Sequence, residues 1–280
     1  MKRRFVPIVL FAVLLARPAG AQQRPLATED PEPIGAGRAL LETGFGFADD
    51  QRYPVSGLDG NLWKVPAIGI SVGISSIAEF QIDGGFNHLA IKHRNPAPLS
   101  HLVAVTGNSV TDVEDIVIGT KIRLLAEAPK HPSFAFRFAT KLPNATNERG
   151  LGLDTTDFYA SLLTAKTVQS IRIVGNIGLG FLADPTVGDR QNDVVTYGLS
   201  FARALTNRAE VVGELNGRNS TREGAAFPGT ESRGLLNLGG RYTRASVRLD
   251  GGVFFGLTSL DPTWGFTTGL TFVFNAFQVP

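Results

Sequence analysis

Twelve segments in which apolar residues alternate with small or polar ones run between Arg38 and Phe274. In the last segment, one face would carry every second residue from Trp264 to Phe274, and the other face mainly Gly, Thr and Val. A period of two is typical of a β-strand with two different faces. Each segment has roughly the ten residues that a tilted membrane-spanning strand needs. The pattern predicts an all-β fold, a transmembrane antiparallel β-barrel of about 12 strands.

The connections between these segments alternate between long and short. The short ones are Ser75–Ile77, Glu127–Pro132, Lys166–Gln169, Leu205–Asn207 and Thr243–Ala245, and the long ones are Ala48–Asn61, Lys92–Val113, Pro143–Thr156, Leu182–Asp193, Arg218–Arg233 and Thr258–Thr263. Short periplasmic turns and long extracellular loops give this order when both termini lie in the periplasm. A soluble sandwich is the alternative, but its outward faces would be polar, whereas here they are rich in Ile, Leu and Phe.

The first 21 residues have the three parts of a secretory signal. A basic start (Lys2, Arg3, Arg4) precedes the apolar stretch 5–16, and Ala19-Gly20-Ala21 forms a cleavage site. The stretch is too short for an anchor helix, which needs roughly twenty residues. We therefore predict a signal peptide (1–21), a Pro-rich lead (22–37) and one barrel domain (38–280). The lead is assigned to the periplasm, with entry into the lumen as the alternative.

Charge and cysteine content limit the classes of function. The signal holds four of the 27 basic residues and no acidic one, which leaves 23 basic against 25 acidic residues. The mature chain is thus weakly acidic and lacks the basic footprint of a nucleic-acid partner. It has no cysteine, so the oxidising compartment would leave no disulfide. The expected location is the outer membrane of a Gram-negative-type bacterium, after export.

The alternation also predicts which charged side chains face the lumen. The basic ones are Lys121, Arg123, Arg137, Lys141 and Arg172, and the acidic ones are Glu79, Asp83, Glu210 and Glu214. Such groups could form a polar path that selects a small, anionic solute. Alternatively, they could pair with one another and fill a closed barrel. Many inward positions are Gly, which either leaves space in the lumen or permits strand curvature.

Several segments contain motifs that a known family shares. Glu114-Asp115-Ile116-Val117-Ile118-Gly119-Thr120-Lys121 and Phe138-Ala139-Thr140-Lys141-Leu142-Pro143 resemble two strands of the outer-membrane barrel family named for the meta-cleavage pathway of phenol degradation. The first is similar to its Gly-Asp-hydrophobic-Gly-x-Lys strand, and the second to its strand that ends in Leu-Pro before an outer loop. Asn176-Ile177-Gly178 and the run 249–265 resemble further strands. Glu114 stands where the family has Gly, and Asn144 where it has Thr-Gly. The resemblance implies a transporter-like barrel for which an aromatic solute is one candidate.

A channel or transporter for small solutes, aromatic or anionic, is the function we expect. A closed structural or partner-binding barrel that works through its outer loops is the alternative. A membrane enzyme would need a nucleophile and a base on one patch of wall, and only His88 lies on a predicted strand, so we expect no enzyme. His93 and His101 in the longest loop lack regular ligand spacing, and no metal or cofactor is expected.

Two further expectations concern the surroundings of the barrel. Some of Trp63, Tyr159, Tyr197, Tyr242 and Trp264 should belong to the aromatic girdle at the membrane interface. The strand Thr267–Phe274 resembles the C-terminal signal of the barrel-assembly machinery, although Asn275–Pro280 follow it. The expected partners are therefore outer-membrane lipid, that machinery and a small solute.

Overall fold

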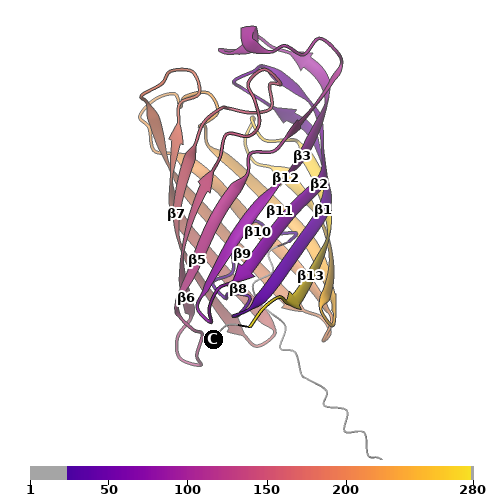
Figure 1. Cartoon of the computed structure of the whole chain (residues 1–280), viewed down its shortest axis with the longest axis vertical. Coiled ribbons are helices and arrows are strands. Elements are labelled where there is room, and N and C mark those ends of the chain that lie inside the picture. The colour runs from indigo at the N-terminus through magenta and orange to yellow at the C-terminus, as the bar shows by residue number, and fades with distance from the viewer. Residues whose placement is uncertain (1–23, 279–280) are drawn as a thin grey trace, which may run out of the picture.

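Residues 24–278 are described by a computed structural model, in which the chain forms a closed antiparallel barrel (Figure 1). The first strand, β1 (Arg38–Arg52), pairs with the last, β13 (Trp264–Asn275), from Arg38 opposite Asn275 to Asp49 opposite Trp264. This pairing closes the ladder, so the wall has no free edge. The predicted signal peptide lies outside the described residues.

The strands follow one another around the wall in chain order. Between β1 and β13 lie β2 (Leu58–Gly73), β3 (Ala78–Arg94), β4 (Ser109–Val113), β5 (Val117–Leu125), β6 (Ser133–Lys141), β7 (Asp157–Val168), β8 (Ile171–Ala183), β9 (Gln191–Ala204), β10 (Ala209–Ser220), β11 (Arg233–Arg244) and β12 (Val247–Gly256). Both β4 and β5 pair with β3, one above the other, and share one place in the wall. The barrel therefore has the twelve wall positions that the sequence predicts.

The outer face of the wall carries the apolar half of the alternation. Exposed side chains recur at every second position, for example Leu249, Val253 and Phe255 on β12, and Leu270 and Phe272 on β13. In water this would be a large apolar band, whereas in a bilayer it is the surface that contacts lipid. Among residues 24–278, no helix has the length and apolar character needed to span a membrane.

An aromatic cluster forms on the outer face near the long-loop ends of β1, β2 and β13. Phe47 stacks against Trp63 with ring centroids 4.5 Å apart, and against Trp264 at 5.6 Å. Both tryptophans therefore lie where an interfacial girdle is expected. Tyr159 and Tyr197, two other candidates, instead line the lumen, because they fall on the inward half of the alternation.

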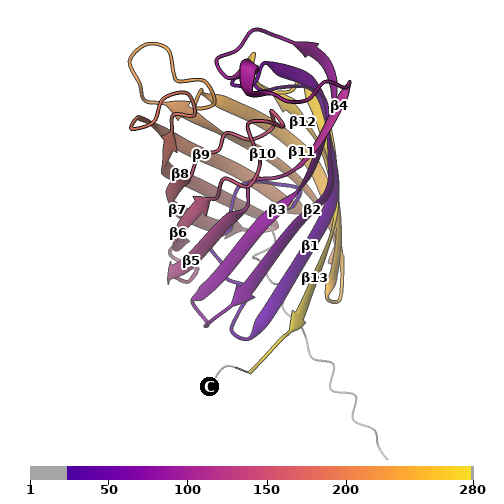
Figure 2. The ribbon, with the colours of Figure 1, turned by 45° about the horizontal axis from the view of Figure 1, so that its top comes forward.

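The structure corrects the predicted loops next to β3. Strand β1 ends at Arg52 and β2 begins at Leu58, so the connection predicted as 48–61 comprises only residues 53–57. The predicted loop 92–113 contains the end of β3, a 3₁₀ turn (Ser100–Leu102) and β4, which rise above the wall in Figure 2. A buried apolar cluster of Leu58, Leu89, Val110 and Leu151 holds this extension together. The sequence pattern missed it because these contacts join β2, β3 and β4 to the loop between β6 and β7, which is distant in the sequence.

The two histidines of this extension, His93 and His101, have different surroundings. His93 hydrogen-bonds to Asp59, with 2.8 Å between Nδ1 and Oδ1, and His101 lies in the 3₁₀ turn. Across residues 24–278, no group of three or more His, Asp and Glu side chains is placed to hold a metal ion.

We expect Ile177→Arg, near the middle of β8, to lower the free energy of unfolding by about 2–4 kcal/mol, the usual cost of Arg on the lipid face of a barrel. Ile177 is 60% exposed on the outer face. Denaturant titration of the protein folded into lipid vesicles measures the change. Val187→Arg, in the exposed loop 184–190, is the control and should change stability little. Equal costs for both substitutions would contradict the lipid-facing assignment.

Candidate functional site

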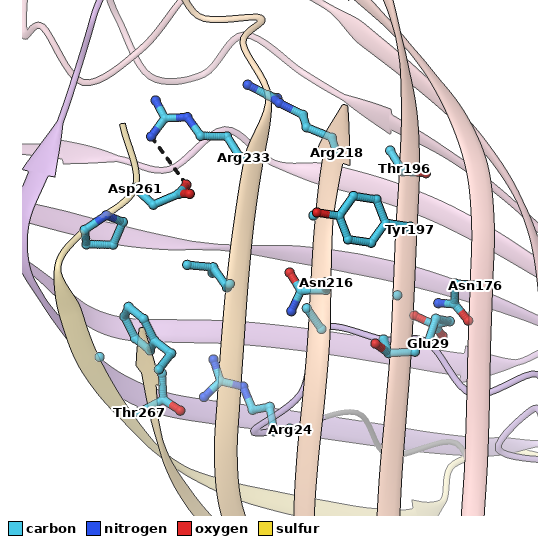
Figure 3. A pocket seen from close by; sticks show the side chains of 18 of the residues that line it. Arg24, Glu29, Asn176, Thr196, Tyr197, Asn216, Arg218, Arg233, Asp261 and Thr267 are labelled. Atoms are coloured by element: carbon cyan, nitrogen blue, oxygen red, sulfur yellow. Dashed lines mark ion pairs between the residues drawn. The ribbon is translucent and has the colours of Figure 1, made fainter. Parts of the chain in front are cut away.

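The lead that precedes β1 lies inside the barrel. Residues 24–34, here called the plug, contact inward-facing groups on strands all around the lumen, and Leu26, Glu29, Pro31 and Ile34 are buried. Figure 3 shows Arg24 and Glu29 on the inner side of the barrel wall. The sequence assigns the lead to the periplasm and leaves entry into the lumen as the alternative. Residues 24–34 lie in the lumen and not in the periplasm.

Lys121 on β5 is the centre of the contact between plug and wall. Its ammonium group lies 2.9 Å from a carboxylate oxygen of Glu29 in the plug and 2.9 Å from one of Glu79 on β3. It also donates a hydrogen bond of 2.8 Å to the carbonyl of Asp30. Lys121 and Glu79 are completely buried, so each charge depends on these partners to offset its desolvation. Arg137 on β6 lies 3.6 Å from Glu29.

The other two plug carboxylates bind separate cations of the wall. Arg172 on β8 donates two hydrogen bonds to Asp30, the bidentate geometry that makes guanidinium–carboxylate pairs strong. Arg123 on β5 donates one of 2.5 Å to Glu32. The acidic run 29–32 is thus complementary to four of the predicted basic residues. These cations bind the chain's own lead, and Arg137 also lines the cavity described below.

Arg172 is also tied to the turn between β5 and β6. It donates a hydrogen bond of 3.1 Å to Glu127, whose carboxylate also accepts from the N–H and hydroxyl of Thr167. Burial alone would raise the pKa of Glu127, but the Thr167 donors and the Arg172 charge hold that pKa below its usual range. The turn therefore fixes the guanidinium that grips Asp30.

The remaining predicted residues have different surroundings. Glu79 accepts from the Ile34 N–H at 2.7 Å, and Glu214 accepts from the N–H groups of Ala27 and Thr28. Lys141 binds Asp157 at 3.0 Å and Asp115 at 3.2 Å near the long-loop end and has no plug partner among these contacts. Glu210 lies 3.9 Å from Arg241. Asp83 lines a small cavity of about 160 Å³ together with Arg24 and Lys64.

Inward glycines provide the space that the plug occupies. A Cβ at Gly44 would lie 1.7 Å from the Arg24 guanidinium, and one at Gly198 would lie 2.7 Å from the Thr28 hydroxyl. A Cβ at Gly239 would lie 2.9 Å from Pro25. Contacts this short require one of the partners to move. At these positions the small wall therefore makes room for the plug, which neither of the two sequence interpretations of the glycines specified.

The sequence did not single out the plug residues that make these contacts. Asn176 on β8 pairs with the backbone of Glu29, accepting its N–H at 2.7 Å and donating to its carbonyl at 2.9 Å. A usable signal was present, since three acids within 29–32 stand against an excess of inward basic residues on β5, β6 and β8. The alternation along a strand predicts which of its side chains face the lumen. It does not predict which segment outside the wall those side chains contact.

A cavity of about 790 Å³ lies between the plug and the long loops, and we call it the vestibule. Arg24, Ala27, Thr28 and Glu29 of the plug form part of its lining, and Asp261 and Pro262 belong to the loop between β12 and β13. Tyr159 on β7 belongs to its wall, and Figure 3 shows Tyr197, Arg218 and Arg233, which β9, β10 and β11 contribute. The lumen is thus hollow on the long-loop side of the plug.

Comparison with known proteins supports the architecture. The structure resembles that of the COG4313 outer membrane channel from Pseudomonas putida F1, with a TM-score of 0.63, 12% identity, and coverage of 88% of this chain and 98% of that one. It also resembles the NanC porin, with a TM-score of 0.54, 6% identity, and coverage of 83% and 98%. No family model and no curated protein matches the sequence. At these identities the likeness establishes the fold of an outer-membrane β-barrel.

We expect Lys121→Met to lower the free energy of unfolding by about 3–5 kcal/mol, because it removes the buried cation that Glu79 and Glu29 share and leaves Glu29 with Arg137. Denaturant titration in detergent or lipid measures this. Lys130→Met, in the exposed turn between β5 and β6, is the matched control. Adding Glu29→Gln and Glu79→Gln to Lys121→Met should restore part of the loss. A single substitution no more costly than the control would show that the buried cluster contributes little.

Proposed function

We propose that the protein is an outer-membrane channel for small solutes, and that its own N-terminal segment narrows the lumen. The observation that carries this proposal is the vestibule, a large cavity inside a closed barrel that the plug borders. The fold shared with the two barrels named above supports it. Export to the outer membrane, assembly there and contact with its lipid belong to the same proposal.

The size of the vestibule favours transport over a purely structural role. Sites for small organic molecules commonly have volumes of roughly 300–1,000 Å³, and this cavity has about 790 Å³. A barrel that served only as a scaffold could fill its interior with side chains, as the smallest membrane barrels do. Here the wall is instead kept small at positions such as Gly46 and Ala48, which line the vestibule.

The way in which the plug is attached favours a narrowed rather than a permanently sealed channel. The plug lies outside the β-ladder, and its side chains hold it largely through ion pairs. Moving it would therefore break none of the pairings that close the wall. Four ion pairs and several hydrogen bonds nevertheless hold residues 24–34 in the lumenal position, which we take as the resting one. A solute would pass beside the plug or after a shift of the segment.

A closed barrel that binds a partner through its outer loops is the second candidate. The observation that favours it is the plug itself, because Glu29, Asp30 and Glu32 satisfy wall cations that an open channel would present to solutes. The two candidates differ in conductance, and one experiment separates them.

We expect discrete single-channel steps from the mature protein in a planar bilayer, and a several-fold larger conductance after Glu29→Gln, Asp30→Asn and Glu32→Gln are combined. The triple substitution removes the charges that hold the plug to Lys121, Arg123 and Arg172. Opening should also shift selectivity toward anions, because the wall cations would then face the lumen.

The matched control combines Glu148→Gln, Asp189→Asn and Glu223→Gln, which remove the same charge from exposed outer loops. Its conductance should stay close to that of the unchanged protein. If no variant gives steps, although each shows the heat-modifiable gel migration of a folded barrel, the channel proposal fails and the loop-binding barrel takes its place.

A further inference from the structure

The geometry points to an anion-binding site in the vestibule, formed by Arg218 and Arg233, and we propose that it takes a small organic carboxylate with an apolar body. The inference rests on the proposed function, for which it supplies the class of solute. It concerns a part of the lumen apart from the plug contacts, since neither arginine binds a plug carboxylate in the ion pairs described above.

The two arginines form a directly opposed pair across adjacent strands. Arg218 on β10 is the register partner of Arg233 on β11, and both line the vestibule. Figure 3 shows the two side chains next to each other on neighbouring strands. Like charges directly opposite one another destabilise a sheet. A bound anion would attract both guanidinium groups and so offset that repulsion.

Loop carbonyls fix the orientation of both guanidinium groups. Arg218 donates to the carbonyl of Glu231 at 2.9 Å and to that of Gly229 at 2.8 Å. Arg233 donates to the carbonyl of Leu260. These acceptors are neutral, so they position the guanidinium groups without cancelling their charge. A pair of cations held in this way is preorganised for an anionic ligand.

Carboxylates close to the pair compensate its charge only in part. Asp261 lies 3.7 Å from Arg233, but its other oxygen already accepts from the Gly234 N–H, the Thr258 N–H and the Thr258 hydroxyl. The Glu231 carboxylate acts on Arg233 electrostatically but does not line the cavity.

Across the whole vestibule the lining is cationic. It includes Arg24, Lys64, Arg137, Arg218 and Arg233, against the carboxylates of Glu29 and Asp261. Lys64 binds Glu114, and Arg137 has Glu29 as its partner. The lining therefore has an excess of positive charge, five cations against two carboxylates, and Arg218 and Arg233 are the two of these cations that lie opposite each other on adjacent strands. Planar guanidinium groups suit a planar carboxylate, which can accept two parallel hydrogen bonds.

Apolar groups lie beside the arginine pair in the same cavity. Tyr197, Phe254 and Leu235 line it, and Figure 3 shows the Tyr197 ring beside the strand of Arg218. A Cβ at Gly217 would lie 2.6 Å from the Tyr197 hydroxyl, so that glycine leaves room for the ring to lie against the wall. A ligand that used both parts of the site would have a carboxylate at one end and a compact apolar body at the other.

Isothermal titration calorimetry of the detergent-solubilised mature protein tests the proposal with three probes. Benzoate has both parts of the ligand, benzamide has the same shape without the charge, and acetate has the charge without the body. We expect benzoate to bind at least tenfold more tightly than either of the others. Equal affinities for benzoate and benzamide would overturn the anion site, and equal affinities for benzoate and acetate would overturn the apolar part.

Substitutions at the pair locate the binding. Arg218→Gln and Arg233→Gln should each weaken benzoate at least tenfold, while Arg218→Lys, which keeps the charge but not the planar fork, should lose less than Arg218→Gln. Arg149→Gln, in the exposed loop between β6 and β7, controls for general electrostatics and should leave binding unchanged. Benzoate binding that survives both Gln substitutions overturns the assignment.

Folding and channel activity are read separately from binding. Heat-modifiable gel migration shows whether each variant is folded, and if Arg233→Gln is not, the two Arg218 variants decide the question. Conductance measured without any organic acid tests the channel alone. Channel steps without benzoate binding would overturn the site and leave the channel, whereas benzoate binding without steps would do the opposite.

Discussion

A β-ladder that crosses lipid has to close on itself, because the hydrocarbon offers no water to pair with free backbone N–H and C=O groups. The pairing of β1 with β13 meets this requirement here, and the rest of the structure depends on it. Closure gives every strand one face toward lipid and one toward an enclosed space. It also means that any charged residue on the inner face needs a partner within that space.

The plug supplies those partners for one sector of the wall. Lys121 would be a buried cation with Glu79 alone if the lead left the lumen, and Glu29 makes the second ion pair. Because a buried charge is tolerated only with good partners, the acidic run of the lead and the basic run of β5, β6 and β8 stabilise each other. The same contacts place the plug inside the lumen, on the short-turn side of the vestibule.

The vestibule differs from the plug contacts in how its charges are used. Around Lys121, cations and carboxylates pair with each other and leave little for a ligand. At Arg218 and Arg233, mainly backbone carbonyls hold the cations, and the opposing strand places them side by side. Charge compensated inside the protein favours stability, and charge held in place by neutral groups favours recognition.

The sequence by itself determined the class of fold, the number of wall positions and the face on which most strand residues lie. These follow from a period of two and from alternating loop lengths, which are local properties that each strand shows without reference to the others. Local pattern also identified the inward charges Lys121, Arg123, Arg137 and Arg172. Only the tertiary structure decided what those charges bind, because Asp30 and Arg172 are far apart in the chain and meet only once the barrel has closed around the lead. The same holds for the Arg218–Arg233 pair, since strand register, and not composition, sets two arginines opposite each other at the edge of a cavity.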